Sequence, residues 1–268
     1  MIPRFFGDAE QQLFGVYHPA TGAPSGRAGA VLCYPGPQEY RQAHWAYRRL
    51  AGLLAEAGVP VLRFDYYATG DSAGESGDGS LARWVEDTRT AAEELRDVAD
   101  VRRVSLVGMR LGGAIAARAC AAGGRGAAAD GFADLVLWDP VVRGAEYLTA
   151  LEAENVSGLR ERTYPESDVP EPGHLIGYAV TPAMRDELGA LDLTAEGCGR
   201  PARALLVAAE VRPEYQAVAE ALRADGVPCG VRPTGDPTLT HGGHWSTDTL
   251  LAQRTPAVVA EFLAAGGR

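Results

Sequence analysis

The sequence predicts an α/β fold, a mostly parallel central sheet flanked by helices. Short apolar runs, typical of strands buried on both faces, alternate with segments of helical periodicity through most of the 268 residues. The links between them are short, which favours parallel strands joined by right-handed helical crossovers. With 46% hydrophobic and 22% charged residues, the composition is that of an ordinary globular protein.

The elements are expected in a regular order along the chain. Strands are expected at 4–6, 11–17, 28–34, 59–66, 104–107, 134–139, 202–209 and 227–232, where apolar residues gather. Helices are expected at 44–57, 80–99, 114–122, 212–225 and 255–265. Ser80 is expected to be the N-cap of the second helix, and Gly58 to close the first.

Residues 143–200 interrupt this alternation. The segment is rich in charges, contains four prolines and has no strong β signal. We expect a largely helical lid there, inserted between the two parts of one core, residues 1–142 and 201–268. A loop is expected at 240–246, before the last helix.

Charge and composition exclude several classes of function. The net charge of −10, from 25 basic and 35 acidic residues, argues against non-specific binding to nucleic acid or to an anionic membrane. All basic residues are arginine, so lysine Schiff bases and a P-loop lysine are excluded. No apolar run is long enough to span a membrane.

The four cysteines have neither a CxxC motif nor the spacing of metal ligands; they are Cys33, Cys120, Cys198 and Cys229. This usage indicates a reduced, intracellular protein with buried thiols. The N-terminus lacks the apolar region of a signal peptide, so we expect a cytoplasmic protein. We expect no metal and no cofactor, and a homodimer is compatible with the sequence.

The segment 104–113 has the layout of a nucleophile elbow. It reads as an apolar strand, a sharp turn and a helix of small residues, for which the pattern is G-x-S-x-G followed by glycine. Arg110 stands where that pattern has serine. Arginine is not deprotonated in proteins and is not a nucleophile.

Candidate site residues follow the carboxyl ends of the expected strands, where ligands of open parallel sheets lie. They are Tyr34, Gln38, Arg110, Asp139 and Glu210. The later loop at 240–246 adds His244 beside Trp245. The order of elbow, acid and histidine matches that of the α/β-hydrolases.

On these motifs the whole chain resembles the α/β-hydrolases of the serine aminopeptidase and lysophospholipase type. Within them it looks most like the hydrolase-like proteins associated with exosortase systems. The matching segments are 32–36, 62–67, 70–74, 108–113, 137–140 and 243–245. The resemblance implies an α/β-hydrolase fold with His244 as general base and Glu210 as the acid that orients it. It also implies that Leu111 supplies an oxyanion-hole amide.

The chain departs from the family pattern at two independent positions. Besides Arg110 at the nucleophile position, Pro37 stands where the second oxyanion donor is expected, and proline has no N–H. Gln38 would replace it if the loop aligns one residue differently. Because acyl transfer needs both a nucleophile and an oxyanion hole, ordinary serine-hydrolase turnover is not expected.

Arg110 has two interpretations. In one it is a structural residue whose guanidinium pairs with a neighbouring carboxylate. In the other it anchors an anion or polarises a carbonyl, answered by Glu210, by Asp139 or by a substrate carboxylate or phosphate. Asp139 itself is interpreted either as a pocket carboxylate or as a cap for the segment that follows.

A second G-x-S-x-G occurs at 70–74. It follows its strand by several loop residues and opens no helix, so we interpret it as a turn near the site. Ser72 within it is the substitute nucleophile if hydrolysis occurs. Cys33, Trp84 and Trp138 are interpreted as core residues.

Three functional hypotheses remain open. The first is a non-hydrolytic or atypical enzyme that acts on a small acyl or carboxylate-bearing metabolite through His244, Glu210 and Arg110. The second is a non-catalytic pseudo-hydrolase that binds a ligand or a partner protein. The third is a hydrolase of esters or thioesters that uses Ser72 or an activated water.

Overall fold

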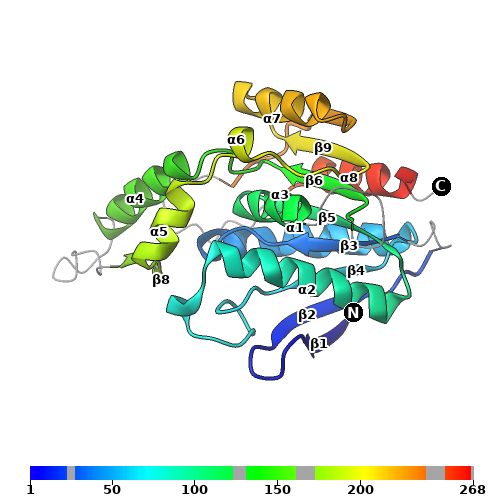
Figure 1. The fold of residues 1–268 in the computed structure, drawn as a ribbon, viewed down its shortest axis with the longest axis horizontal. Coiled ribbons are helices and arrows are strands. Elements are labelled where there is room, and N and C mark those ends of the chain that lie inside the picture. Colours follow the sequence, from blue (N-terminus) through cyan, green and yellow to red (C-terminus); the bar gives the residue numbers. More distant parts are fainter. Residues whose placement is uncertain (23–27, 123–130, 161–172, 240–250, 267–268) are drawn as a thin grey trace.

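The computed structural model describes residues 1–22, 28–122, 131–160, 173–239 and 251–266, with only the backbone of 157–160 (Figure 1). The expected loop at 240–246, with its histidines, lies outside the described residues.

One large sheet organises the described residues. Its strand order is β1-β2-β4-β3-β5-β6-β9-β10. Strands β1 and β2 pair antiparallel, as β2 does with β4, and the remaining pairs are parallel. The predicted α/β class is therefore confirmed. The strands are β1 (Ile2–Phe6), β2 (Leu13–His18), β3 (Ala28–Cys33), β4 (Val61–Phe64), β5 (Arg103–Met109), β6 (Asp134–Trp138), β9 (Arg203–Ala208) and β10 (Cys229–Pro233).

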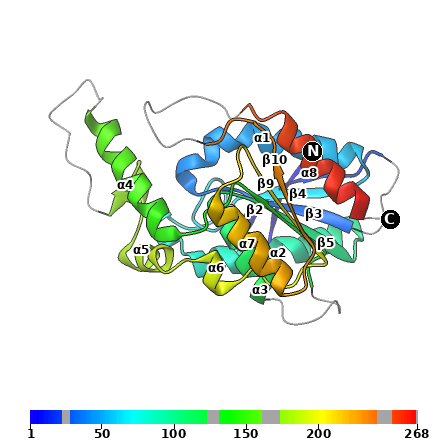
Figure 2. The same ribbon diagram turned by 90° about the horizontal axis from the view of Figure 1, so that it is seen from above.

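Helices cover both faces of this sheet. Helix α1 packs against α8, and α2 packs against α3. Figure 2 shows α1 and α8 on one side of the strands, with α2, α3 and α7 on the other. The covering helices are α1 (Pro37–Glu56), α2 (Leu81–Ala99), α3 (Leu111–Ala122), α7 (Pro213–Ala224) and α8 (Arg254–Gly266).

The first helix begins seven residues before its expected start, and that expectation was wrong. Gly36 is the N-cap and Pro37 takes the first helical position, where a missing N–H costs nothing. The extra turns bury Glu39 on the same face as Ala43 and Leu50. For α2 the predicted cap is confirmed, because the Ser80 hydroxyl accepts a hydrogen bond from the N–H of the residue three positions later.

The described residues of the segment 143–200 are largely helical, as expected, but they also contain a small hairpin. Their elements are α4 (Gly144–Arg160), β7 (His174–Leu175), β8 (Tyr178–Ala179), α5 (Pro182–Gly189) and α6 (Leu193–Glu196). A short 3-10 helix from the loop after β4, η1 (Ser76–Asp78), packs on β8. The hairpin was missed because each strand has two residues and no alternating pattern. Its turn places Ile176 and Gly177 at positive φ.

Helices α4 and α5 lie beyond one end of the large sheet (Figure 1). A carboxylate from α5 links them to the sheet's own helices. Glu187 accepts hydrogen bonds from the N–H groups of Leu81 (2.6 Å) and Ala82 (3.3 Å), at the start of α2. These are donors without intrahelical partners, so the contact satisfies the first turn of α2.

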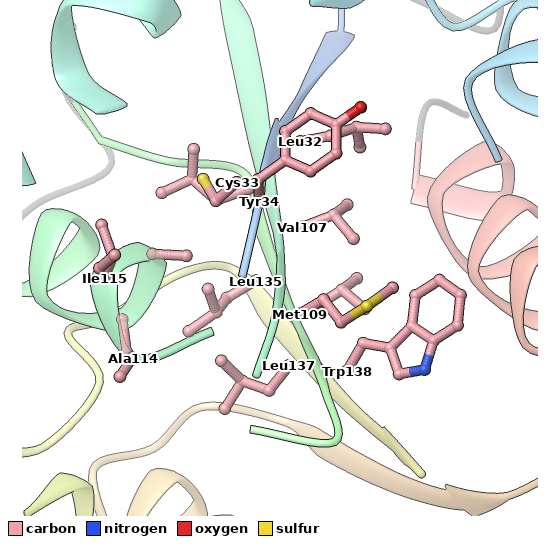
Figure 3. Close-up of a cluster of buried hydrophobic side chains, with 14 of the residues drawn as sticks. Leu32, Cys33, Tyr34, Val107, Met109, Ala114, Ile115, Leu135, Leu137 and Trp138 are labelled. Atoms are coloured by element: carbon pink, nitrogen blue, oxygen red, sulfur yellow. The ribbon is translucent and has the colours of Figure 1, made fainter. Parts of the chain in front are cut away.

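The interior is filled from both faces of the sheet. Figure 3 shows Leu135 and Leu137 directed toward Ile115 of α3, while Met109 and Trp138 lie on the opposite face. Cys33 is fully buried, and Trp84 and Trp138 are each 3% exposed, which confirms their interpretation as core residues.

Candidate functional site

The turn between β5 and α3 brings the chain past its own backbone. Arg110 has φ +53°, a left-handed conformation that is uncommon for a residue with a side chain. A Cβ atom at Gly108 would lie 2.1 Å from the carbonyl oxygen of Gly112, and one at Gly112 would lie 2.2 Å from that of Tyr34. Both glycines are therefore required by close approach.

Arg110 forms a buried ion pair. Its Nε lies 3.0 Å from Oε1 of Glu39, and its Nη1 lies 3.6 Å from Oδ2 of Asp139. The side chain of Arg110 is 11% exposed, and both carboxylate side chains are 3% exposed. Burial alone lowers the pKa of Arg110, but Glu39 and Asp139 raise that pKa by more. The guanidinium is charged. Its contacts are those of the first interpretation, in which Arg110 is a structural residue paired with neighbouring carboxylates.

Glu39 comes from the first turn of α1 and was not foreseen. Its Oε2 accepts a hydrogen bond of 3.1 Å from the hydroxyl of Tyr147 on α4. Burial raises the pKa of Tyr147 well above its ordinary value, so this hydroxyl keeps its proton. The ring of Tyr147 also lies 5.9 Å from the Arg110 guanidinium. The elbow, α1 and α4 thus meet in one polar cluster.

Asp139 follows β6 at φ +45° and is 2% exposed. Its Oδ1 accepts hydrogen bonds from the hydroxyl of Tyr215 and from Nη2 of Arg212, the latter at 3.2 Å. Burial and the carboxylate raise the pKa of Tyr215. Asp139 therefore belongs to the same cluster as Arg110 and does not line the large cavity described next.

A cavity of about 320 Å³ lies where the strand ends meet α4, β8 and α5. Its volume is within the range of small-molecule sites. None of its described lining residues is charged. They are Pro37, Gln38, Tyr40, Ala68, Thr69, Gly70, Ser72, Gly74, Ser76, Trp84, Leu111, Tyr147, Leu151, Tyr178, Ala179, Val180, Met184 and Leu188.

Arg110 is not part of that lining. It borders a separate cavity of about 160 Å³, together with Arg143 and Arg212. Tyr147 lines both cavities and lies between them. Within the described part of the chain, the elbow residue therefore does not face the larger space.

The structure brings some predicted site residues together and separates others. Gln38, Leu111 and Ser72 line the large cavity. Tyr34 is not among the described lining residues: it is 2% exposed and its hydroxyl accepts a 2.7 Å hydrogen bond from Arg63, so its assignment to substrate binding stays a prediction. Glu210 lies in the loop after β9 and is exposed.

His244 lies outside the described residues, so its distance from Glu210 is not part of the structure. The predicted pairing of this histidine with its acid stays a prediction. The same holds for the roles of both residues in catalysis.

Ser72 has a structural environment. Its hydroxyl donates to the carbonyl oxygen of Asp65 at 2.6 Å and accepts from the N–H of Phe14 at 2.8 Å. Gly70 and Gly74 beside it have φ +54° and +96°, as the interpretation of a turn requires. Both partners of the hydroxyl are backbone groups, which does not favour activation as a nucleophile.

Sequence reasoning missed Glu39 and Tyr147. A signal for Glu39 was present, because it shares the helical register of Ala43 and Leu50, but the helix was started too late. No signal of that kind marks Tyr147, which lies in the least regular part of the sequence.

No helix in the described ranges is long and apolar enough to cross a membrane. In the same residues, no group of three or more histidine, cysteine, aspartate or glutamate side chains could hold a metal ion.

Comparison with protein families gives a match over most of the chain. The model of a family described as serine aminopeptidase, S33, matches residues 28–227. A search of curated proteins finds no match.

Solved structures match the chain over almost its whole length. One is Est1E from Butyrivibrio proteoclasticus with bound ferulic acid, at 17% identity, TM-score 0.64, and coverage of 98% of this chain and 96% of that one. An esterase of Pyrococcus furiosus matches at 16% identity and TM-score 0.65, with 100% and 91% covered. Proline iminopeptidase of Mycobacterium smegmatis matches at 14% identity and TM-score 0.63, with 99% of each chain covered.

Proposed function

We propose that this chain, which belongs to the serine aminopeptidase S33 family of α/β-hydrolases, binds a small neutral molecule in the large cavity. No acyl-enzyme is formed at the elbow. The family and the similar structures indicate an α/β-hydrolase of esterase or peptidase type and support an enzyme. In this protein the ligand would bind as a substrate does in those enzymes, but no covalent intermediate would form.

The observation that carries the proposal is the pairing of Arg110. Its Nε and Nη1 are directed to Glu39 and Asp139, and its side chain borders the smaller cavity. It therefore offers no nucleophile and no cation to a molecule in the larger cavity. A carboxylate-bearing ligand would find no cationic side chain among the described lining residues, which favours a neutral acyl compound.

We also propose that residues 143–200 act as the lid of this cavity. Tyr147, Leu151 and Met184 from α4 and α5 form part of its wall. A ligand would be held between these helices and the loops that follow β3, β4 and β5.

The test uses 4-nitrophenyl butyrate, a neutral ester of suitable size. We expect it to raise the melting temperature of the protein without release of nitrophenolate above the buffer rate, and we expect no labelling by a fluorophosphonate probe. Leu151→Trp, which fills the cavity, should abolish the thermal shift. Val156→Trp is the matched control, because Val156 lies on the same helix and is 42% exposed.

The opposite results would refute the proposal in recognisable ways. Covalent labelling at Ser72, with turnover of the ester, would establish the hydrolase that uses this serine. An unchanged thermal shift in Leu151→Trp would show that the ester binds somewhere other than the large cavity.

A second candidate function is acid–base catalysis without a covalent intermediate. Gln38 and Leu111 both line the cavity and lie in the first turns of α1 and α3, where N–H groups lack intrahelical partners. Such groups can polarise a substrate carbonyl. His244 would then remove a proton beside it, oriented by Glu210.

Exchange of the protons next to the carbonyl of 4-phenyl-2-butanone, followed by NMR in heavy water, tests this second candidate. His244 would take the proton and return a deuteron, so the ketone is regenerated. Protein-dependent exchange that disappears in His244→Ala supports the candidate. Exchange at the buffer rate in the unaltered protein eliminates it for this ketone class.

A further inference from the structure

Three residues that line the large cavity have hydroxyl groups whose protons are already donated to other groups of the protein. The hydroxyl of Tyr40 donates to Oδ1 of Asp65 at 2.8 Å. That of Thr69 donates to the carbonyl oxygen of Tyr66 at 2.8 Å. That of Ser72 donates to the carbonyl oxygen of Asp65 at 2.6 Å. A hydroxyl has one proton and two lone pairs, so each can offer a ligand only a lone pair.

Two further polar side chains of the lining are committed in the same way. Nε1 of Trp84 donates to the carbonyl oxygen of Tyr67 at 3.0 Å, and the hydroxyl of Tyr147 donates to Glu39. An indole has no acceptor to offer in return. Side-chain donors of the described lining are thereby reduced to those of Gln38, Ser76 and Tyr178.

The charge behind this surface favours the same kind of ligand. Asp65 is 4% exposed and lies behind Tyr40, with its Oδ2 accepting the N–H of Asp71 at 3.0 Å. Because the Tyr40 hydroxyl donates to a carboxylate, its oxygen becomes a stronger acceptor through the cooperativity of linked hydrogen bonds. No described residue of the lining carries a positive charge to oppose this.

We propose that Tyr40, Thr69 and Ser72 form an acceptor wall, which selects neutral ligands that present a hydroxyl group as hydrogen-bond donor and disfavours carboxylates. The apolar remainder of such a ligand packs on the other lining residues, among them Leu151, Val180 and Met184. This inference rests on the proposed occupation of the large cavity and adds to it the class of head group.

The test compares four probes that share one aromatic tail: 2-phenylethanol, 2-phenylethylammonium, 2-phenylethyl methyl ether and 3-phenylpropanoate. Their dissociation constants are measured on the full chain by titration calorimetry. Because one net hydrogen bond is involved, we expect the alcohol to bind about fivefold more tightly than the ether, which has lost only the donor. The carboxylate should bind weakest. Weaker binding of the ammonium than of the alcohol would support a neutral hydroxyl head group, and an ammonium that binds as tightly or more tightly would refute it.

Two variants assign the selectivity to the acceptor wall. Tyr40→Phe keeps the ring, whose centroid lies 4.4 Å from that of Tyr34, and removes only the oxygen. Thr69→Val likewise preserves shape. Each should reduce the preference for alcohol over ether while binding of the ether stays constant. Tyr178→Phe is the matched control, because this tyrosine lines the cavity but does not belong to the acceptor wall.

The outcomes separate the two proposals. If all four probes bind equally well, and Leu151→Trp abolishes their binding, the cavity is occupied and the acceptor wall is refuted. If the ether or the carboxylate binds more tightly than the alcohol, the acceptor wall is also refuted. If none of the probes binds, the occupation of the cavity and the selectivity both fail.

Discussion

Replacement of Arg110 by methionine tests the buried ion pairs directly. Methionine keeps an unbranched apolar stem but is shorter than arginine, and it removes the charge and the hydrogen-bond donors. Glu39 would lose its 3.0 Å partner while its side chain is only 3% exposed. Asp139 would keep Arg212 and Tyr215. The penalty therefore comes mostly from Glu39.

Removal of one partner from a buried ion pair costs roughly 3–5 kcal/mol of unfolding free energy. We expect about 3 kcal/mol for Arg110→Met, at the lower end, because Asp139 retains two partners. Urea denaturation followed by circular dichroism measures this value.

Arg118→Met is the matched control, on the helix that the elbow begins. Its pair with Glu196 has side chains 24% and 30% exposed, so its removal should cost at most about 1 kcal/mol. The double variant Arg110→Met with Glu39→Gln should recover part of the loss, because a neutral amide then replaces the buried carboxylate that lost its cation. Equal losses for Arg110→Met and Arg118→Met would refute the buried-pair account.

Three other predictions follow from contacts of the described residues. Gly112→Ala would place a Cβ atom 2.2 Å from the carbonyl oxygen of Tyr34 and should lower the unfolding free energy by about 3 kcal/mol in urea denaturation. A Cβ atom at Gly52 meets nothing within 4 Å, so Gly52→Ala should stabilise α1 by about 0.5–1 kcal/mol. Burial, and to a lesser extent nearby positive charge, lowers the pKa of His18 from 6.5 to about 4, so the neutral form stabilises the fold above pH 6.5. Roughly 2 kcal/mol of unfolding free energy should be lost as the pH falls from 6.5 to 4. A difference in unfolding free energy from His18→Gln that does not change with pH would contradict this. Burial raises the pKa of the Cys33 thiol to about 12, so Ellman's reagent should modify it only at the rate of unfolding, and rapid modification of the native protein would contradict its burial.

The strands were predictable because apolar runs determine them. Residues 28–34 and 134–139 were expected as strands, and the structure has them within one or two residues. The order of the strands in the sheet was not predictable from residue patterns, since pairing depends on contacts between distant segments. The start of α1 was missed because Pro37 was interpreted as a loop residue, whereas it is the first residue of the helix.

The candidate site was only partly predictable. Positions at strand ends were correctly expected near a cavity, as for Gln38 and Leu111. The direction of a side chain was not predictable from its position, as the burial of Tyr34 beside the cavity lining illustrates. Arg110 pairs with Glu39, so its direction could not be predicted without the position of that residue. Glu39 lies in the first turn of α1, the part of the helix that the sequence patterns did not predict.

The conformation of the elbow carries a separate consequence. Left-handed geometry at a catalytic serine is easily credited to selection for reactivity. Here an arginine that cannot react holds φ +53°, between two glycines that admit no Cβ. The sharp turn is therefore a requirement of the connection between this strand and this helix, whichever residue stands at the elbow position. The fold provides the geometry that a nucleophile would use, and a non-reactive residue can occupy the position without any change in the fold.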